Sequence, residues 1–562
     1  MARGRITRRV DFEIEPDEVL LDASNLPHFD TNQFQGRIIA PIEKRSLVTF
    51  GIGAALVFII LIGELFSLQV SHGEEHALRS ESNRLEQSIL FATRGVVFDR
   101  NGEELISNVD DGETFSAREY RSPGFGHLLG YVTYPKKDSA GFYFSTEIEG
   151  VSGLEAVLDE RLQGENGLVL VESTARGEVR SSEAVLKPIN GENVTLSIDA
   201  RIQESLYTHI KTLADQIPFR GGAGIIMDIH TGEVLALTNY PEYDPNVLAA
   251  GDDRDTIVSY QNDSRKPYLN RAISGLFAPG SVVKPFVAIA ALEENVVDIT
   301  DTFLSTGQIS IPNPYFPDQP TIFRDWKAHG YVNVVRALAV SSNVYFYIVG
   351  GGYNGQEGLG IDRLASWFSK FEFNKPTGIG LNNEATGFIP TPAWKKETFG
   401  EDWRIGDTYY TAIGQYAVQT TPIAMVRAVA AIANGGDLVT PTVLKGEIGP
   451  KKHISFSEET RQIVISGMKE VVNNSEVGTA RGVKNNHVSV AAKTGTAQVG
   501  NNNSLHNAWI EGYFPVENPK YAFVVVMERG PSSNLIGAVS VMRNVLEDIA
   551  ISAPEYFTVD GE

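Results

Sequence analysis

The chain has 562 residues, and its 48 Lys and Arg against 70 Asp and Glu give a formal net charge of −22 at pH 7. Such an acidic surface repels phosphate backbones, and no basic patch offsets it, so no nucleic-acid partner is expected. A hydrophobic content of 42% and a charged content of 21% exclude a wholly disordered or fibrous chain. Cysteine is absent, which excludes disulfides, thiolate nucleophiles and cysteine-bound zinc.

One long apolar run lies early in the chain. Residues 46–70 carry a single charged side chain, Glu64, and these 25 positions match a helix that crosses about 30 Å of hydrocarbon. Their apolar side chains point in every direction, so the run predicts a transmembrane helix, with a buried helix of a soluble domain as the alternative. A cleaved signal peptide fits poorly, because the run is long, starts far from Met1 and lacks a small-residue cleavage site.

Basic residues flank this run on its N-terminal side. Arg37, Lys44 and Arg45 precede it, and the next basic residue after it is Arg79. Because Lys and Arg favour the cytoplasmic side of a membrane, residues 1–45 are expected to be a cytoplasmic tail, largely disordered. The chain is therefore predicted to be a single-pass protein of the cytoplasmic (inner) membrane, in contact with the lipid bilayer, with everything after the run extracytoplasmic.

Residues 71–200 predict a small α+β module. Its first part, 72–90, is polar and compatible with a helical stalk, and Asn101-Gly102 between two apolar runs is the strongest short hairpin signal. A helix is expected over 153–163. Strands are expected over 168–173 and 193–199. No chemical motif occurs in this region, so we interpret it as a pedestal that holds the next domain away from the membrane.

Residues 201–556 predict one larger domain. A helix is expected over 199–217, followed by a hairpin that turns at His230-Thr231-Gly232. Helical patterns follow at 285–295, 332–348, 422–434, 458–473 and 537–552, and strand patterns at 488–499, 508–514 and 520–530. Strands at both ends with helices between them predict an α/β domain whose sheet is closed by N- and C-terminal segments.

Ser281 and Lys284 form the first chemical motif, S-x-x-K. Residues i and i+3 share one helix face, and Pro285 is tolerated only in a first helical turn, so the pair is expected at a helix start. There the helix dipole favours an alkoxide and disfavours an ammonium, so a neutral Lys284 could act as base toward a nucleophilic Ser281. Ser466 and Lys469 have the same spacing inside an amphipathic helix and are interpreted as chance.

Ser341 and Asn343 form the second motif, S-x-N, at a helix–loop junction. The Ser341 hydroxyl could relay a proton, and the Asn343 carboxamide could orient the substrate and the lysine. An ordinary turn or cap is the alternative for any isolated S-x-N, and Ser532 and Asn534 match the pattern too.

Lys493, Thr494, Gly495 and Thr496 form the third motif after a strand-like segment. The lysine offers positive charge to a substrate carboxylate, the threonines offer hydroxyls, and the glycine lets a ligand approach the backbone. The backbone N–H groups of Ser281 and Thr496 are candidates for an oxyanion hole. An exposed edge strand without chemistry is the alternative.

The three motifs gain meaning from their order. Ser341 lies 60 residues after Ser281, and Lys493 lies 152 residues after Ser341, which is the signature order of penicillin-binding proteins and serine β-lactamases. The chain resembles class B penicillin-binding proteins, the D,D-transpeptidases of peptidoglycan synthesis, and most resembles the penicillin-binding protein 2 group of the elongation machinery. Further segments that carry the resemblance are 94–108, 127–132, 150–167, 277–286, 325–347, 394–436 and 491–498.

The resemblance implies a transpeptidase domain with a central antiparallel sheet and helices, as in serine β-lactamases, beside the pedestal and one transmembrane helix. It also implies a serine acyl-enzyme, peptidoglycan stem peptides ending in D-Ala-D-Ala as substrate, and β-lactams as inhibitors. A SEDS-family glycosyltransferase of the RodA type is the implied partner. The mechanism requires no metal or organic cofactor, and Asp325 and His329, spaced i and i+4, are interpreted as structural.

Three other functions remain open at this point: a division-type transpeptidase, a D,D-carboxypeptidase or β-lactamase-like hydrolase, and a non-catalytic receptor for β-lactams or muropeptides. A hydrolase needs a positioned water, for whose general base no local signature is found, and a receptor needs a larger output domain than residues 1–45. Two departures from the family pattern are also visible. The segment 109–126 is short, and Gly414-Gln415-Tyr416-Ala417 replaces the usual Gly-Gln-Gly-Tyr.

Overall fold

The structure, a computed structural model, describes residues 44–72, 74, 84–110, 114–139, 143–173, 179–313, 316, 318–534 and 536–558. They divide between two units, which are described separately. One lies within Met1–Glu86 and Val171–Ser182, and the other lies within Gln87–Leu170 and Glu183–Glu562.

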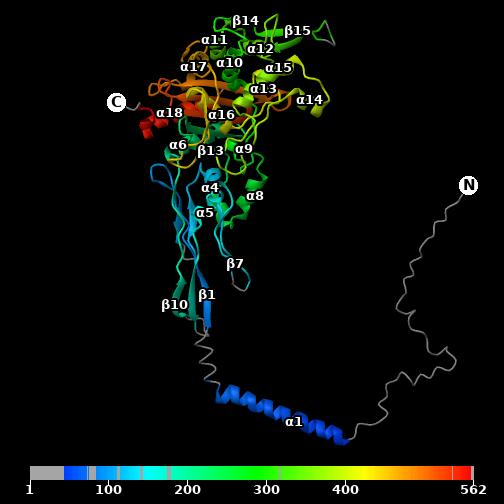
Figure 1. The fold of residues 1–562 in the computed structure, drawn as a ribbon, viewed down its shortest axis with the longest axis vertical. Helices are drawn as coiled ribbons and strands as arrows, with labels where there is room; N and C mark the ends of the chain where they lie inside the picture. The colour runs from blue at the N-terminus through cyan, green and yellow to red at the C-terminus, as the bar shows by residue number, and fades with distance from the viewer. Residues whose placement is uncertain are drawn as a thin grey trace, which may run out of the picture. The chain divides into compact units, whose positions relative to one another are not determined.

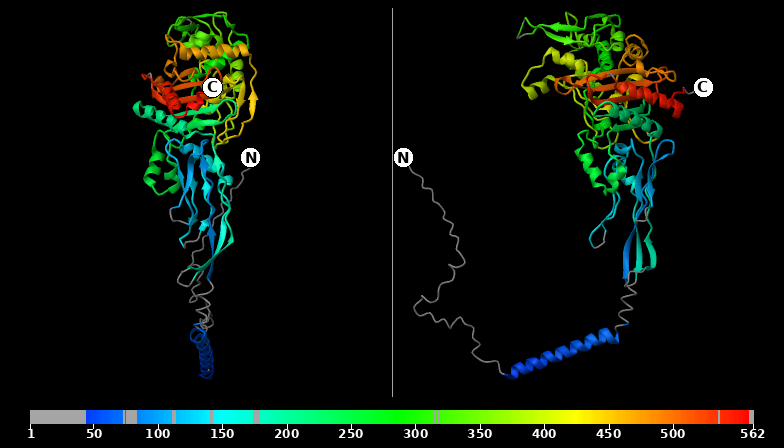
Figure 2. Two further views of the ribbon diagram at one scale, coloured as in Figure 1. Left: turned by 90° about the vertical axis from the view of Figure 1, so that its left-hand side faces the viewer. Right: turned by 180° about the vertical axis from the view of Figure 1, so that it is seen from behind.

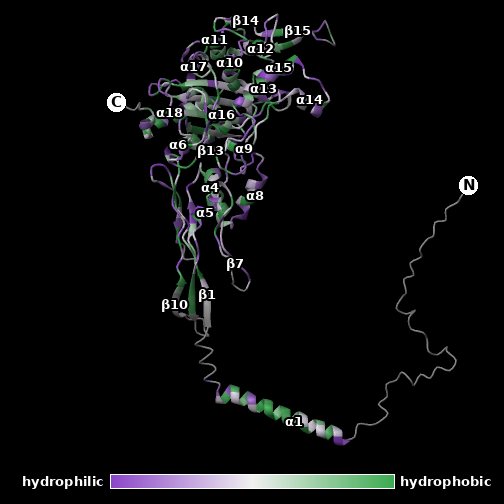
Figure 3. Ribbon diagram, in the orientation of Figure 1, coloured by the Kyte–Doolittle hydropathy of each residue, from purple (hydrophilic) through white to green (hydrophobic). Residues whose placement is uncertain are grey.

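A long apolar helix belongs to the first unit. Helix α1 (Lys44–Phe66) continues into a π-helical turn at Ser67–Ser71. The span has a mean hydropathy of 2.5 and its most apolar stretch is not buried against the protein; Figure 3 colours much of it as hydrophobic. A helix of this length and composition can cross a membrane, whereas a buried helix of a soluble domain would be covered. Of the predicted tail, residues 1–45, the part up to residue 43 lies outside the described residues.

Strand β1 (Arg84–Leu90) corrects the expectation of a helical stalk over 72–90. It forms a three-stranded sheet with β9 (Gly167–Ser173) and β10 (Val179–Leu186), in the order β1-β9-β10. The prediction was wrong for β1 because pairing with a strand far along the chain outweighs a weak local preference for helix. Residues 73 and 75–83 lie outside the described part.

The rest of the pedestal region is α+β, as expected. Its four-stranded sheet has the order β11-β2-β3-β4, with β2 (Val97–Phe98), β3 (Glu104–Val109), β4 (Ala117–Tyr120) and β11 (Val194–Thr195). The predicted hairpin at Asn101-Gly102 joins β2 to β3, and Gly102 has a φ of 89°. The remaining elements are α3 (Gly126–Leu129), α4 (Gly153–Val157), α5 (Asp159–Leu162) and the strand pairs β5 (Val132–Thr133) with β8 (Glu149–Gly150) and β6 (Lys136–Lys137) with β7 (Tyr143–Ser145).

A five-stranded antiparallel sheet forms the centre of the larger domain (Figure 1). Its order is β13-β12-β22-β21-β20, with β12 (Gly221–Asp228), β13 (Val234–Tyr240), β20 (Ala491–Val499), β21 (Leu505–Phe514) and β22 (Tyr521–Pro531). The sheet therefore combines strands from both ends of the domain, as the sequence predicts.

Helices cover both faces of this sheet. Helices α6 (Ala200–Gln216) and α18 (Ala538–Ser552) pack on one face, where Figure 2 shows them in teal and red, and α16 (Pro422–Ala433) packs on the other. Strand side chains alternate accordingly: Ile225 and Met227 belong to the core that contains α16, and Ile226 belongs to the core of α6 and α18.

The remaining elements of the domain surround the α16 side and the periphery. The helices are α7 (Pro245–Ala250), α8 (Arg254–Asn262), α9 (Arg271–Ser274), α10 (Lys284–Glu293), α11 (Val334–Ala339), α12 (Asn343–Gly351), α13 (Gly360–Lys370), α14 (Pro392–Phe399), α15 (Ile405–Ala412) and α17 (Glu458–Asn473). Short strand pairs are β14 (Phe303–Ser305) with β17 (Gly330–Val332), β15 (Gln308–Ile311) with β16 (Thr321–Arg324), and β18 (Asp437–Val439) with β19 (Lys451–His453).

The pedestal region and the larger domain meet through polar contacts within the second unit. The backbone N–H groups of Gly124 and Gly126 donate to the two carboxylate oxygens of Glu242, the latter over 3.0 Å. Gln203 Nε2 on α6 donates to Gly124 O over 2.8 Å, and Arg100 Nη2 donates to Glu233 Oε2 over 3.3 Å. The loop that ends in α3 is thus fixed to the larger domain by buried and part-buried hydrogen bonds.

Candidate active site

Ser281 lies in the turn that precedes α10. Gly280 has a φ of 59°, a left-handed conformation that suits glycine, and its N–H donates to Gly414 O over 2.9 Å. A 3₁₀ turn covers Gly280–Val283, and α10 begins at Lys284 with Pro285 in its first turn. The predicted helix start is confirmed, and it places Ser281 at the N-terminal end of α10.

The Lys284 amine is fully buried and faces the second motif. Its Nζ donates to Ser341 O over 2.7 Å and to Asn343 Oδ1 over 2.8 Å, and it lies 3.3 Å from Ser341 Oγ. Burial, and after it the charge of Lys493, holds the pKa of Lys284 well below its usual value. Both effects favour the neutral amine, the form that a general base requires.

The second motif lies where α11 ends and α12 begins. Ser341 is buried with a φ of 55°, so the helical pattern over 332–348 is interrupted here and forms two helices. Ser342 caps α12, because its Oγ accepts the N–H of Tyr345 over 3.3 Å. Asn343 is the first residue of α12, which directs its carboxamide to Lys284.

Asp325 fixes this turn from a neighbouring loop. Its Oδ2 accepts Ser342 Oγ over 2.8 Å and the N–H of Val344 over 3.0 Å. Burial alone would raise the pKa of this carboxyl, but His329, whose Nε2 lies 3.7 Å from Oδ1, and the backbone of Val344 and Asn343 lower it to about 2. The charged carboxylate therefore acts as a structural anchor for the S-x-N turn.

Lys493 brings the third motif to the same point. It is fully buried on β20, and its Nζ donates to Ser341 Oγ over 2.8 Å and to Thr494 O over 2.7 Å. Burial lowers the pKa of Lys493 to about 7, against the opposing effect of the Glu511 charge. Ser341 Oγ thus lies within reach of two amines.

The rest of the third motif lies along the edge strand β20. Thr496 is exposed, and Thr494 is partly buried with its Oγ1 at 2.6 Å from Thr479 Oγ1. A Cβ on Gly495 would lie 2.8 Å from Pro279 O and 3.1 Å from Val282 N. The strand backbone therefore passes directly against the turn that carries Ser281, an approach that only glycine permits.

The three motifs are brought together by these contacts. Lys284 and Lys493 both contact Ser341, Asn343 accepts a hydrogen bond from Lys284, and Gly495 packs against the Ser281 turn. Within the described residues, the Ser281 hydroxyl makes no hydrogen bond, so its expected contact with the Lys284 amine is not formed here. Catalytic hydrogen bonds often tighten only in the substrate complex, so this geometry does not exclude the pair.

The two repeated patterns in the sequence lie elsewhere. Ser466 is exposed on α17, and its Oγ donates to Gln462 O of the same helix over 2.7 Å. Ser532 N donates to Ser504 O in a turn after β22. Neither serine contacts the lysines of the motifs, so the structure supports their interpretation as chance matches.

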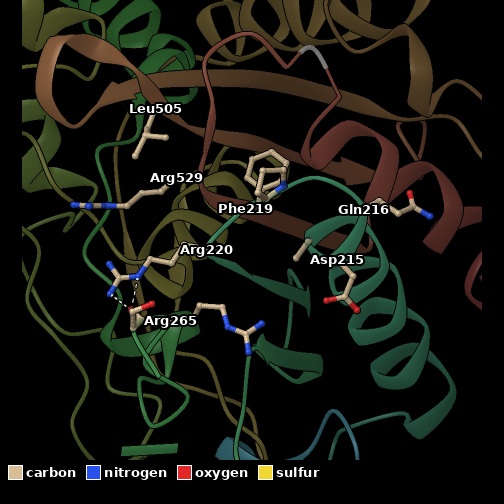
Figure 4. Close-up of a pocket in the computed structure, with 10 residues that line it drawn as sticks. Asp215, Gln216, Phe219, Arg220, Arg265, Leu505 and Arg529 are labelled. Carbon is tan, nitrogen blue, oxygen red and sulfur yellow. Dashed lines mark hydrogen bonds between the residues drawn. The ribbon is translucent and has the colours of Figure 1, made fainter. Parts of the chain in front are cut away.

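A cavity of about 810 Å³ contains none of the motif residues (Figure 4). Arg220, Arg265 and Arg529 line it, but Arg265 is paired with Asp263 and Arg220 donates to the carbonyl of Ser264. The candidate site is therefore located by the convergence of the motifs and not by the size of a cavity.

Two residues near the site carry no motif signal. Asp325 was noted in the sequence only for its spacing to His329, and Glu511 lies in a strand pattern without any marked role. Glu511 is fully buried and stands opposite Lys493 in the β20–β21 register. A charged residue inside an otherwise apolar strand is the one signal that could have singled it out.

Two family models match the chain. The model described as penicillin binding protein transpeptidase domain covers residues 222–547, more than half of the chain. The chain belongs to this family. A second model, the penicillin-binding protein dimerisation domain, covers residues 111–196.

Named relatives of this penicillin-binding protein are similar over most of their length. It is 28% identical to the peptidoglycan D,D-transpeptidase MrdA of Escherichia coli K12, over 90% of this chain and 94% of that one. It is 26% identical to the enzyme of the same name from Acinetobacter baumannii, over 86% of this chain and 85% of that one.

Solved structures give the same result. The structure of Pseudomonas aeruginosa PBP2 in complex with WCK 5153 is 29% identical, with a TM-score of 0.69, over 85% of this chain and 99% of that one. PBP2 from Helicobacter pylori in complex with MreC is 27% identical, with a TM-score of 0.68, over 83% and 99%. The predicted fold, a transpeptidase domain with a central antiparallel sheet beside an α+β module and one apolar helix, is confirmed.

Proposed function

We propose that this penicillin-binding protein is a peptidoglycan D,D-transpeptidase that cross-links stem peptides during cell elongation, with Ser281 as nucleophile. The observation that supports this most strongly is the convergence of Lys284 and Lys493 on Ser341 beside the Ser281 turn, with Asn343 bound to Lys284. The named relatives, which are D,D-transpeptidases and PBP2 structures, point to the same reaction.

Acylation begins with the Ser281 hydroxyl. Its proton passes to the neutral Lys284 amine while Oγ attacks the carbonyl carbon of the penultimate D-Ala. The N–H groups of Ser281 and Thr496 are our candidates to hold the oxygen that becomes negative. The C–N bond to the terminal D-Ala then breaks, and the leaving amine takes a proton through Ser341, which both lysines reach.

Deacylation transfers the acyl group to an amine. The amine of a neighbouring stem attacks the ester carbonyl, Ser281 leaves with a proton, and a new amide bond forms the cross-link. Lys493, Thr494, Gly495 and Thr496 are assigned to the terminal carboxylate of the donor stem, since they offer one cation, two hydroxyls and an open backbone along β20. Loss of this carboxylate with D-Ala leaves room for the acceptor.

The same geometry makes the protein a β-lactam target. A β-lactam presents a reactive amide next to a carboxylate, as D-Ala-D-Ala does, so it acylates Ser281. The opened ring stays in the position that an acceptor amine would need, so no amine can attack and the acyl-enzyme persists.

Helix α1 is assigned as the membrane anchor over residues 46–70. From the basic residues before it we infer that residues 1–45 are cytoplasmic and that the pedestal (71–200) and transpeptidase domain (201–556) are extracytoplasmic. A solved structure described as "Structural coordination of polymerization and crosslinking by a peptidoglycan synthase complex" is 26% identical to this chain. A glycosyltransferase partner, of the SEDS-family RodA type, is therefore our proposal for this chain.

A reaction assay tests the assignment against hydrolysis. Purified full-length protein in detergent is given a stem pentapeptide with and without an acceptor amine. A transpeptidase releases D-Ala and forms the cross-linked amide in proportion to acceptor, and Ser281→Ala does neither. Release of D-Ala without amide at every acceptor concentration, or many turnovers of a chromogenic β-lactam, would show a hydrolase instead. Normal cell shape with Ser281→Ala as sole copy would favour a receptor.

The place of action in the cell tests the elongation role. A fluorescently tagged chain should lie along the lateral wall, and accumulation at the septum alone would indicate the division-type enzyme.

A further inference from the structure

Glu511 is the buried carboxyl closest in register to the motif lysine. In the antiparallel pair β20–β21, Glu511 stands directly opposite Lys493. Both side chains are fully buried. Directly opposed residues have their Cβ atoms about 4.5–5.5 Å apart and point to the same face of the sheet.

The packing of the neighbours shows which face this is. Trp509 and Tyr513, two positions either side of Glu511, belong to the core that contains α16, whereas Ile510 belongs to the core of α6 and α18. Glu511 and Lys493 therefore share the face on which α10, α16 and α17 pack, the face of the active site.

The Glu511 carboxylate has no hydrogen-bond partner among the described residues. The Lys493 amine gives its hydrogen bonds to Ser341 and Thr494 and none to Glu511. A buried carboxylate with neither oxygen satisfied is costly, and no described hydrogen bond explains its presence. Its remaining interaction is electrostatic, with the lysine opposite.

Two amines compete for charge around one hydroxyl. Lys284 Nζ lies 3.3 Å and Lys493 Nζ lies 2.8 Å from Ser341 Oγ, so a proton on one disfavours a proton on the other. The charge of Asp325, whose Oδ2 is bound to Ser342 and Val344, also acts on Lys284 and raises its pKa. Glu511 is the carboxyl that faces the Lys493 side of this pair.

We propose that Glu511 is a positioning residue that keeps the proton on Lys493, so that Lys493 binds the substrate carboxylate while Lys284 remains a neutral base. This proposal rests on the proposed function. It explains why Lys493 is charged and Lys284 is neutral in that mechanism. Burial lowers the pKa of Lys493 and raises the pKa of Glu511 well above its usual value, and the charge of each group opposes the shift of the other, so the two charged forms support each other. The charge of Lys493 in turn lowers the pKa of Lys284, in agreement with the proposed roles.

The test compares Glu511→Gln, Glu511→Asp and wild type as full-length proteins in detergent. The second-order rate constant of acylation by a β-lactam that carries a free carboxylate, which combines binding and the chemical step, is measured from pH 5.5 to 8.5. Loss of the carboxylate in Glu511→Gln is expected to move the alkaline fall in rate about one pH unit lower, which is about tenfold less acylation at pH 7.5 with recovery near pH 6. Glu511→Asp should keep the wild-type profile.

A methyl ester of the same β-lactam supplies the matched control. It has no carboxylate for Lys493 to hold, so the ratio between wild type and Glu511→Gln is expected to be close to one. A structural role of Glu511 would instead slow acylation by acid and ester alike. The loss for the acid should appear as weaker binding before acylation and not as a slower chemical step.

If Glu511→Gln does not fold, Glu511→Val takes its place in the same comparison, because valine is apolar and favours strands. A folded variant with the wild-type pH profile on the acid, or an equal loss on acid and ester, would overturn the proposal. Failure of wild type to acylate at Ser281 at all would overturn the proposed function instead, so the two outcomes are distinguishable.

Discussion

Ser341 Oγ accepts a hydrogen bond from Lys493 Nζ over 2.8 Å, although 152 residues separate the two in the chain. The Lys284 amine lies 3.3 Å from the same oxygen. One hydroxyl thus connects the amine beside the nucleophile with the amine that is assigned to the substrate carboxylate. Ser341 holds this place in a left-handed backbone conformation, with a φ of 55°.

Replacement of Ser341 should separate stability from activity. A left-handed conformation costs a residue with a Cβ about 1–2 kcal/mol, so Ser341→Gly relieves that strain but loses the hydrogen bonds of the hydroxyl. We expect an unchanged or higher melting temperature together with an acylation rate reduced about 10²–10⁴-fold, the usual contribution of a proton-transfer group. Stopped-flow acylation and thermal unfolding of the same samples check this. Wild-type acylation by Ser341→Gly would contradict the proton-relay role.

Asp325→Asn should loosen the S-x-N turn. The neutral amide keeps the shape but weakens the bonds from Ser342 and Val344, at an expected cost of about 1–3 kcal/mol of unfolding free energy at pH 7. Because the pKa of Asp325 is lowered to about 2 from the usual 3.8, its contribution is present above pH 3.8 and is lost as the pH falls toward 2. The wild-type and Asp325→Asn stabilities should therefore converge in acid, and a constant difference between pH 7 and 2.5 would refute this.

Glu242 should make the contact between pedestal and transpeptidase domain sensitive to pH. Burial raises the pKa of this carboxyl to about 8, although the N–H groups of Gly124 and Gly126 oppose the shift. From pH 4.5 to 8 the unfolded chain has lost this proton and the folded chain still holds it, so stability falls with rising pH across that window. Glu242→Gln should remove this part of the pH dependence, at the cost of one of the two hydrogen bonds from Gly124 and Gly126, because an amide has a single acceptor oxygen. Melting curves of wild type and Glu242→Gln at pH 5, 6.5 and 8 test this. The same pH dependence of stability in both proteins would count against the assignment.

Gly414→Ala should disturb the nucleophile turn. A Cβ at this position would lie 2.2 Å from Gly280 O, and Gly414 has a φ of 70°. Overpacking and backbone strain each cost about 1–3 kcal/mol, and the displaced Gly280 carries Ser281 with it. Both the melting temperature and the acylation rate are expected to fall. Gly435→Ala is a strain-only control, since it has a φ of 91° and open space around its Cβ, and it should lower stability alone.

The site could be predicted from the sequence where short spacing or simple backbone rules determine it. Pro285 alone fixes the start of α10 just after Ser281, and Gly102 marks the β2–β3 hairpin. The order of the three motifs predicts Ser281, Ser341 and Lys493 over the repeated patterns at Ser466 and Ser532, and in the structure the three motifs lie together. The predicted helix over 458–473 agrees with α17 because its amphipathic pattern is long and regular.

Features that depend on distant pairing could not be predicted in this way. Strand β1 was expected to be helical because its pairing with β9 leaves no local signal. The pairing of Glu511 with Lys493 follows from the register of β20 and β21, which a shift of one residue would destroy. The break at Ser341 inside a helical pattern likewise follows from the anchoring of the turn by Asp325, a contact between separate segments.

The central claim is that Ser281 becomes acylated, and mass spectrometry tests it most directly. The full-length protein is treated with benzylpenicillin and digested, and the mass of the intact drug is sought on the peptide that contains Ser281. Ser466→Ala removes the serine of the competing S-x-x-K pattern and should be labelled like wild type. Ser281→Ala should carry no label. A penicillin adduct on Ser281→Ala, or one located on another serine of the wild-type protein, would contradict the account.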